Sequence, residues 1–120
     1  MKKSNKNVHK IREIGKGGIE DYLRKEVIKR GGFCIKQNPN WHTGIYDRLV
    51  GLPGFLCLVE TKRPVGGRLR LSQRTFKKSL QKLNIPHYEL HTFEMIDEFL
   101  KPYPLRESHE TAKHGTRFPL

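Results

Sequence analysis

The sequence predicts an α/β protein in which a mixed β-sheet is flanked by helices. Three segments carry apolar residues at helical spacing with charged residues between them, the pattern of amphipathic helices. Short runs rich in Val, Ile, Leu, Phe and Tyr lie between these segments and are bounded by Gly, Pro and Asn, which is typical of strands. A chain of 120 residues has room for one modest core. Placing helices against a single sheet would bury all these faces together.

The chain is expected to open with a flexible basic arm over residues 1–16, which are polar and weakly patterned. The first helix is expected over residues 17–30, because Ile19, Leu23 and Val27 recur at helical spacing and two glycines follow. This helix would lie against the sheet through its apolar stripe.

Three strands are expected next, over residues 33–37, 45–50 and 55–61. The second and third are joined by GLPG, a tight connection suited to an antiparallel hairpin. The loop NPNWHTG between the first and second is rich in turn residues.

A second helix is expected over residues 73–84, with Ser72 as its N-cap. Its residues Phe76, Leu80 and Leu83 would share one face, and a proline would end it.

The last elements are expected to be a strand over residues 87–90 and a short helix over 93–100. The order is therefore αβββαβα, with the folded domain spanning 17–100 and a tail over 101–120.

The charge of the chain indicates a polyanionic partner. Lys and Arg number 24 against 12 Asp and Glu, a formal charge of +12, so nucleic acid is the first candidate. A merely solubilising basic surface is the alternative. No apolar run reaches the length of a membrane span, and no signal peptide is recognisable, so we expect a cytoplasmic protein. The two cysteines are too few for a disulfide framework.

Three charged residues on the predicted hairpin suggest chemistry. Glu60 and Lys62 would point the same way because side chains alternate along a strand, and the hairpin could bring Asp47 beside Glu60. Two close carboxylates repel each other, and a divalent cation such as Mg²⁺ would relieve that repulsion. A bound cation could activate water for phosphodiester hydrolysis, with Lys62 near the developing charge. Glu20, at the start of the first helix, could add a further carboxylate.

Each of these residues also has a simpler interpretation. The hairpin residues could form a surface salt-bridge patch, and an acid such as Glu20 is favoured in the first turn of any helix by the macrodipole. The E-x-K spacing alone is a weak signal.

Taken together, the motifs resemble those of the VRR-NUC family of the PD-(D/E)xK nuclease superfamily. The resemblance covers residues 20 to 90. Its matches are Glu20, the GG turn at 31 and 32, Lys36, GIYDRL with Asp47, VETKRP with Glu60 and Lys62, and LSQ with Gln73. One departure is Tyr46, which stands where the family has a proline.

The resemblance implies a restriction-endonuclease-like fold and a Mg²⁺- or Mn²⁺-dependent endonuclease. Asp47, Glu60 and Glu20 would be the metal ligands, Lys62 the catalytic lysine, and Gln73 a residue that supports the site. Lys36 would contact phosphate. Stand-alone members from bacteria and their viruses look like Holliday-junction resolvases, which implies a homodimer acting on structured or branched DNA.

The nucleic-acid surface is expected around the site. Besides Lys36, the candidates are Arg48 beside Asp47 and a basic cluster in the following loop and helix, namely Arg68, Arg70, Arg74, Lys77 and Lys78. For any single one of them, an ordinary solvated side chain is the alternative. We favour a packing role for Trp41 and a solvent-facing His42 over stacking on a base.

HETAKH (109–114) is not a zinc motif, because its histidines are five apart. The leading hypothesis is a metal-dependent DNA endonuclease. The alternatives are a non-catalytic nucleic-acid-binding module of the same fold and an RNA-associated structural protein.

Overall fold

The computed structural model describes residues 11–15, 17–38 and 40–106. Its elements follow the order predicted from the sequence, αβββαβα. They are α1 (Ile19–Lys29), β1 (Phe33–Lys36), β2 (Arg48–Leu52), β3 (Phe55–Thr61), α2 (Leu71–Lys82), β4 (His87–Leu90) and α3 (Phe93–Leu100).

The four strands form one mixed sheet in the order β1-β2-β3-β4. The pairs β1–β2 and β2–β3 are antiparallel, and β3–β4 is parallel. A two-residue turn joins Leu52 to Phe55, which face each other in the ladder. Gly54 in this turn has a φ of 74°, a conformation that glycine adopts without strain. The hairpin fixes the register that sets Asp47 against Glu60, one pair beyond Arg48 and Val59.

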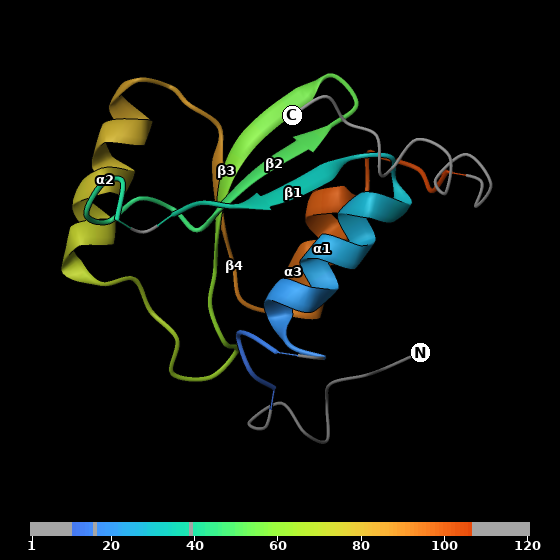
Figure 1. Ribbon diagram of the computed structural model, residues 1–120, viewed down its shortest axis with the longest axis horizontal. Coiled ribbons are helices and arrows are strands. Elements are labelled where there is room, and N and C mark those ends of the chain that lie inside the picture. Colours follow the sequence, from blue (N-terminus) through green and yellow to red (C-terminus); the bar gives the residue numbers. More distant parts are fainter. Residues whose placement is uncertain (1–10, 16, 39, 107–120) are drawn as a thin grey trace.

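Helices cover both faces of the sheet, with α1 and α3 on one side and α2 on the other (Figure 1). The stripe predicted for the first helix is confirmed, because Ile19, Leu23 and Val27 are fully buried. They pack with side chains of β2, β3 and α3 in one hydrophobic cluster. Successive side chains of β3 point to opposite faces of the sheet. Cys57 and Val59 belong to this cluster, on the α1 and α3 face. Glu60, the residue after Val59, therefore projects toward α2.

The second helix differs from its prediction. It begins at Leu71 with Arg70 as N-cap, so the expected Ser72 cap is wrong. The end of the predicted apolar face is also wrong: Leu80 is buried, but Leu83 is 66% exposed. The reason is that the helix ends at Lys82 and Asn84 takes a φ of 57°, which turns the chain away before the next helical turn is complete.

Parts of the predicted arm and tail lie outside the described residues, namely 1–10, 16 and 107–120, which include HETAKH. Within the predicted arm, Ile11 packs against the core cluster. Within the predicted tail, Tyr103 does the same. None of the helices in the described part of the chain is long and apolar enough to cross a membrane.

Tyr46, at the position where the resemblance expects a proline, is fully buried. Its ring lies 6.0 Å from that of Phe76 on α2 and 6.1 Å from that of His87 on β4. It therefore fixes the chain before Asp47 by packing between the sheet and α2, whereas a proline would fix it through φ. Its hydroxyl finds no hydrogen-bond partner in the described part of the chain, and burial raises its pKa to about 12.

We expect Tyr46→Phe to stabilise the protein or leave its stability unchanged. A buried hydroxyl without a partner costs about 1–3 kcal/mol, and phenylalanine keeps the ring. Tyr46→Ala should instead lower the free energy of unfolding by about 3–5 kcal/mol. Urea denaturation measures both, with Tyr88→Phe as the partly exposed control. A destabilisation of more than 1 kcal/mol in Tyr46→Phe would show that the hydroxyl is bonded.

Candidate metal and phosphodiester site

Asp47 is the residue on which the candidate site is centred. It lies one position before β2, not within the strand as predicted. Its carbonyl accepts a hydrogen bond from the backbone N–H of Gln37 (2.8 Å), and its own N–H donates to Glu60 Oε1 (2.9 Å). Its carboxylate accepts from the Thr61 hydroxyl (3.4 Å). The backbone of Asp47 is therefore fixed by both neighbouring strands.

The Glu60 carboxylate is buried, and each of its two oxygens accepts a hydrogen bond. Its Oε2 accepts from Gln73 Nε2 at 2.7 Å and lies 3.1 Å from Lys62 Nζ. Glu60 and Lys62 thus share a face, as the alternation along the strand predicts. Burial raises the pKa of Glu60, although the Lys62 ammonium and the Gln73 amide oppose that shift.

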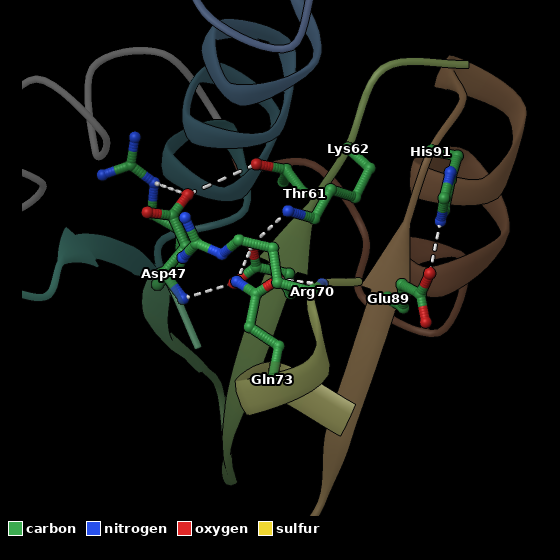
Figure 2. Close-up of polar contacts among 9 residues, drawn as sticks. Asp47, Thr61, Lys62, Arg70, Gln73, Glu89 and His91 are labelled. Atoms are coloured by element: carbon green, nitrogen blue, oxygen red, sulfur yellow. Dashed lines mark hydrogen bonds and ion pairs between the residues drawn. The ribbon is translucent and has the colours of Figure 1, made fainter. Parts of the chain in front are cut away.

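Gln73 links this carboxylate to the start of α2. Its side-chain oxygen accepts the backbone N–H of Arg70 (3.0 Å) while its NH₂ donates to Glu60. The residue is 2% exposed. Asp47, Lys62, Arg70 and Gln73 gather at one end of the sheet, and the contact between Glu89 of β4 and His91 just after it stands apart (Figure 2).

A second group of acids meets Asp47 from the α1 side. Ligand oxygens of Glu13, Glu20 and Asp47 lie within 4.8 Å of one another. Arg48 forms an ion pair with Glu20, and its Nε lies 3.7 Å from Asp47 Oδ2. Asp47 therefore stands between two clusters: Glu13 and Glu20 on the α1 face, and Glu60, Lys62 and Gln73 on the α2 face.

Glu13 reaches the site because the chain before α1 folds back on the helix. The carbonyls of Arg12 and Glu13 accept the backbone N–H groups of Ile19 and Glu20, each at 2.8 Å. These N–H groups belong to the first turn, where a helix has no partner of its own. Gly18 permits the approach, since a Cβ there would lie 2.8 Å from the Arg12 carbonyl oxygen.

The electrostatics of Glu20 indicate that a cation would be favourable here. Burial, a hydrogen bond to Asp47 and the charge of Asp47 raise the pKa of Glu20 from 4.5 to about 7, against the opposing charges of Arg48 and Lys36. Carboxylates at this density repel one another unless a proton or a cation intervenes. Carboxylate oxygens are also the ligands that Mg²⁺ and Mn²⁺ prefer. The donor set therefore fits a hard divalent cation.

A cavity of about 230 Å³ opens beside Asp47. Five predicted site residues line it, namely Asp47, Glu60, Lys62, Arg70 and Gln73, together with three further residues, Glu13, Gln37 and Ile45. Glu20 lines a neighbouring cavity of about 180 Å³ with Arg48 and Arg24. The described part of the chain thus offers acids, an ammonium group and a guanidinium group around one space.

The basic residues predicted to contact nucleic acid lie in different parts of the structure. Arg70 lines the cavity beside Asp47, whereas Arg68, Arg74, Lys77 and Lys78 line a groove of about 380 Å³ along α2. Lys36 is exposed at the end of β1. Arg48 is 11% exposed in its side chain and is held by Glu20, so its guanidinium faces the acids.

Sequence reasoning missed Glu13, Gln37 and the exposure of Trp41. The signal for Glu13 was its position seven residues before Glu20, across a glycine-rich stretch that lets the chain reverse. Trp41 is 68% exposed, so the packing role favoured for it is wrong. His42 is exposed, which confirms its predicted solvent-facing position, and its ring lies near α2, with the ring centroid 5.7 Å from that of Phe76.

Comparison with protein-family models finds no match for the chain, and comparison with curated proteins finds none. Among solved structures, one described as a VRR_NUC domain is similar, with a TM-score of 0.63 and 22% sequence identity. The alignment covers 71% of this chain and 92% of that one. The chain therefore has the α/β fold of that domain, as its motifs predicted.

We expect the metal-free protein to lose stability as the pH rises from about 5 to 8. Because the folded state raises the pKa of Glu20 from 4.5 to about 7, the folded chain holds a proton that the unfolded chain has released across this window. Stability is then highest below pH 4.5 and falls through pH 7. The Glu20 share should be about 1–2 kcal/mol after solvent screening.

Thermal unfolding in EDTA across this pH range, compared between wild type and Glu20→Gln, isolates the contribution of Glu20. The Glu20→Gln profile should be flatter, and Glu98→Gln, an exposed acid of α3, should follow the wild type. Parallel profiles of wild type and Glu20→Gln would contradict the raised pKa.

Proposed function

We propose that this chain is a divalent-metal-dependent nuclease that hydrolyses phosphodiester bonds in DNA. The observation that carries the proposal is the meeting, at Asp47, of two carboxylates within 4.8 Å with the Glu60–Lys62 pair on the other side. A VRR_NUC-like fold supports the same assignment. The net charge of +12 suits a polyanionic substrate.

Asp47, Glu13 and Glu20 are the residues that would hold the cation, with Glu60 beside them. When bound, Mg²⁺ or Mn²⁺ supplies Lewis acidity, polarising a phosphoryl oxygen and lowering the pKa of water. The hydrogen bonds of Glu60 to the Asp47 N–H and to Gln73 fix Asp47 relative to α2. Such fixed positioning is what a site needs before the substrate arrives.

Lys62 is the group assigned to the reacting phosphate. Its ammonium lies 3.1 Å from Glu60 Oε2 and lines the cavity. A buried cation here would stabilise negative charge developing on a phosphate oxygen. Arg70, on the rim of the same cavity, would hold the phosphate through its planar fork of donors.

The finer features of the substrate belong to the proposal as well. We propose that the substrate is structured or branched DNA, including four-way junctions. We also propose that the chain forms a homodimer, which would present one site to each of two strands. The basic groove along α2 would carry the adjoining duplex through phosphate contacts, which do not read sequence.

Asp47→Asn and Lys62→Met should each lower the rate of DNA cleavage at least about 100-fold, the usual cost of removing one charge-stabilising group. A cleavage panel of four-way junction, flap, duplex and single strand, with and without Mn²⁺, measures this. Glu98→Gln is the control and should cleave at the wild-type rate.

Wild-type cleavage by Asp47→Asn, or cleavage that persists in EDTA, would refute the metal-dependent site. If no substrate is cleaved, calorimetric titration with Mn²⁺ distinguishes the alternatives. A protein that binds DNA but no Mn²⁺ would be the non-catalytic nucleic-acid-binding module. In that case the hydrogen bonds and the ion pair that Glu60 already makes would compensate its charge without a cation.

Arg74→Ala combined with Lys78→Ala should weaken DNA binding similarly for all sequences. Each lost phosphate contact should make the dependence of log affinity on log salt shallower by about 0.9. Fluorescence anisotropy between about 50 and 200 mM salt measures the slope, with Lys29→Ala on the α1 face as the control. An unchanged slope in the double variant would place the DNA elsewhere.

A further inference from the structure

Trp41 is the feature that the proposed catalytic site leaves unexplained. It is the single tryptophan of the chain and is 68% exposed, more than any other large aromatic side chain in the described residues. It lies in the loop that leaves β1 at Lys36 and returns to β2 at Arg48. A side chain with this much apolar surface in water is available to a partner.

The loop around Trp41 is braced. The Trp41 N–H donates to the Asn38 carbonyl (3.1 Å), and the Ile45 N–H donates to the His42 carbonyl (3.1 Å). Gly44 has a φ of 86°, and a Cβ there would come within 2.3 Å of the Ser72 carbonyl oxygen. The contact of Gly44 with the start of α2 holds this part of the loop in place, so ordering it around a ligand on Trp41 would cost little entropy.

The same loop forms one wall of the candidate catalytic cavity. Gln37 and Ile45, four residues on either side of Trp41, both line that cavity. Asp47 follows two residues after Ile45. Trp41 therefore lies midway along a loop that contributes a lining residue on each side of it to the space in which the phosphate would be cleaved.

The charge around Trp41 identifies the kind of ligand. The stretch 33–46 holds no Asp or Glu, and neither does the stretch 62–88, which supplies eight Lys and Arg. Part of that second stretch lies against the loop through Phe76 and Ser72. A flat apolar ring beside a cationic surface suits a ligand that is a polyanion and also carries exposed aromatic rings. Single-stranded nucleic acid has both properties.

We propose that Trp41 is a stacking site for an unpaired nucleobase of DNA, held next to the phosphate that is cleaved. The proposal builds on the nuclease function for its biological role. Bases inside an intact duplex already stack on each other and offer no free face, whereas bases at flaps, junctions and strand ends do. Stacking on Trp41 would thus select discontinuous DNA without reading its sequence.

The experiment uses the full chain in EDTA, so that it depends on no metal and no cleavage. A 12-nucleotide single strand and a duplex of 12 base pairs closed by hairpin loops of hexaethylene glycol are titrated, with binding followed by anisotropy of a labelled DNA. Emission of Trp41 is recorded in parallel. We expect the single strand to quench this emission by more than half and the closed duplex to leave it nearly unchanged.

Variants give the second measurement. Trp41→Ala should bind the single strand at least about 5-fold more weakly, the lower end expected for loss of one stacked base, and Trp41→Phe should keep most of the affinity. Both should bind the closed duplex like the wild type. Leu83→Ala, which removes a comparably exposed apolar side chain from the end of α2, is the matched control. Circular dichroism verifies that each variant is folded.

Binding of the single strand without quenching, or equal affinities of Trp41→Ala and wild type, would overturn the stacking site and leave the nuclease proposal standing. An emission shift that depends on protein concentration without DNA would also overturn it, because Trp41 would then lie between copies of the chain. Quenching by the single strand in a protein that cleaves no DNA would support the stacking site and defeat the nuclease proposal.

Discussion

The hydrogen bonds of the buried Glu60 carboxylate hold the candidate site together. They join three parts of the chain that are distant in sequence: the start of β2 through the Asp47 N–H, the start of α2 through Gln73, and the end of β3 through Lys62. A buried carboxylate is costly unless it is paired and hydrogen-bonded. Because Glu60 satisfies this requirement with groups from separate elements, the two layers can meet at the sheet end only in a narrow range of positions.

In the cluster on the α1 face, carboxylates of like charge lie close together. Glu13, Glu20 and Asp47 approach within 4.8 Å, and Arg48 compensates part of their repulsion. Burial, the hydrogen bond to Asp47 and the charge of Asp47 raise the pKa of Glu20 to about 7, against the opposing charges of Arg48 and Lys36. Asp47 takes part in both clusters, because its backbone N–H donates to Glu60 while its carboxylate lies with Glu13 and Glu20. Stability is commonly given up in this way where a protein binds a ligand.

Local patterns were enough to predict most of the fold, because the apolar stripe of α1 and the alternation in β3 report directly on burial. The E-x-K spacing likewise predicted that Glu60 and Lys62 share a face. Glu13 could not be found in this way, since its place depends on carbonyls that accept the first N–H groups of α1. The exposure of Trp41 depends on how the loop meets α2, where Gly44 lies against Ser72 and the His42 ring lies near Phe76.

The segment before α1 limits how far the chain can be shortened at its N-terminal side. Hydrophobic periodicity starts at Ile19, and a shortened recombinant chain beginning there would retain every helix and strand of the sheet layer. It would nevertheless lack Glu13 and the two carbonyls that receive the N–H groups of Ile19 and Glu20. Trimming the chain at the first residue of α1 would thus remove part of the candidate site together with contacts of the first helical turn, although the lost residues belong to no helix or strand.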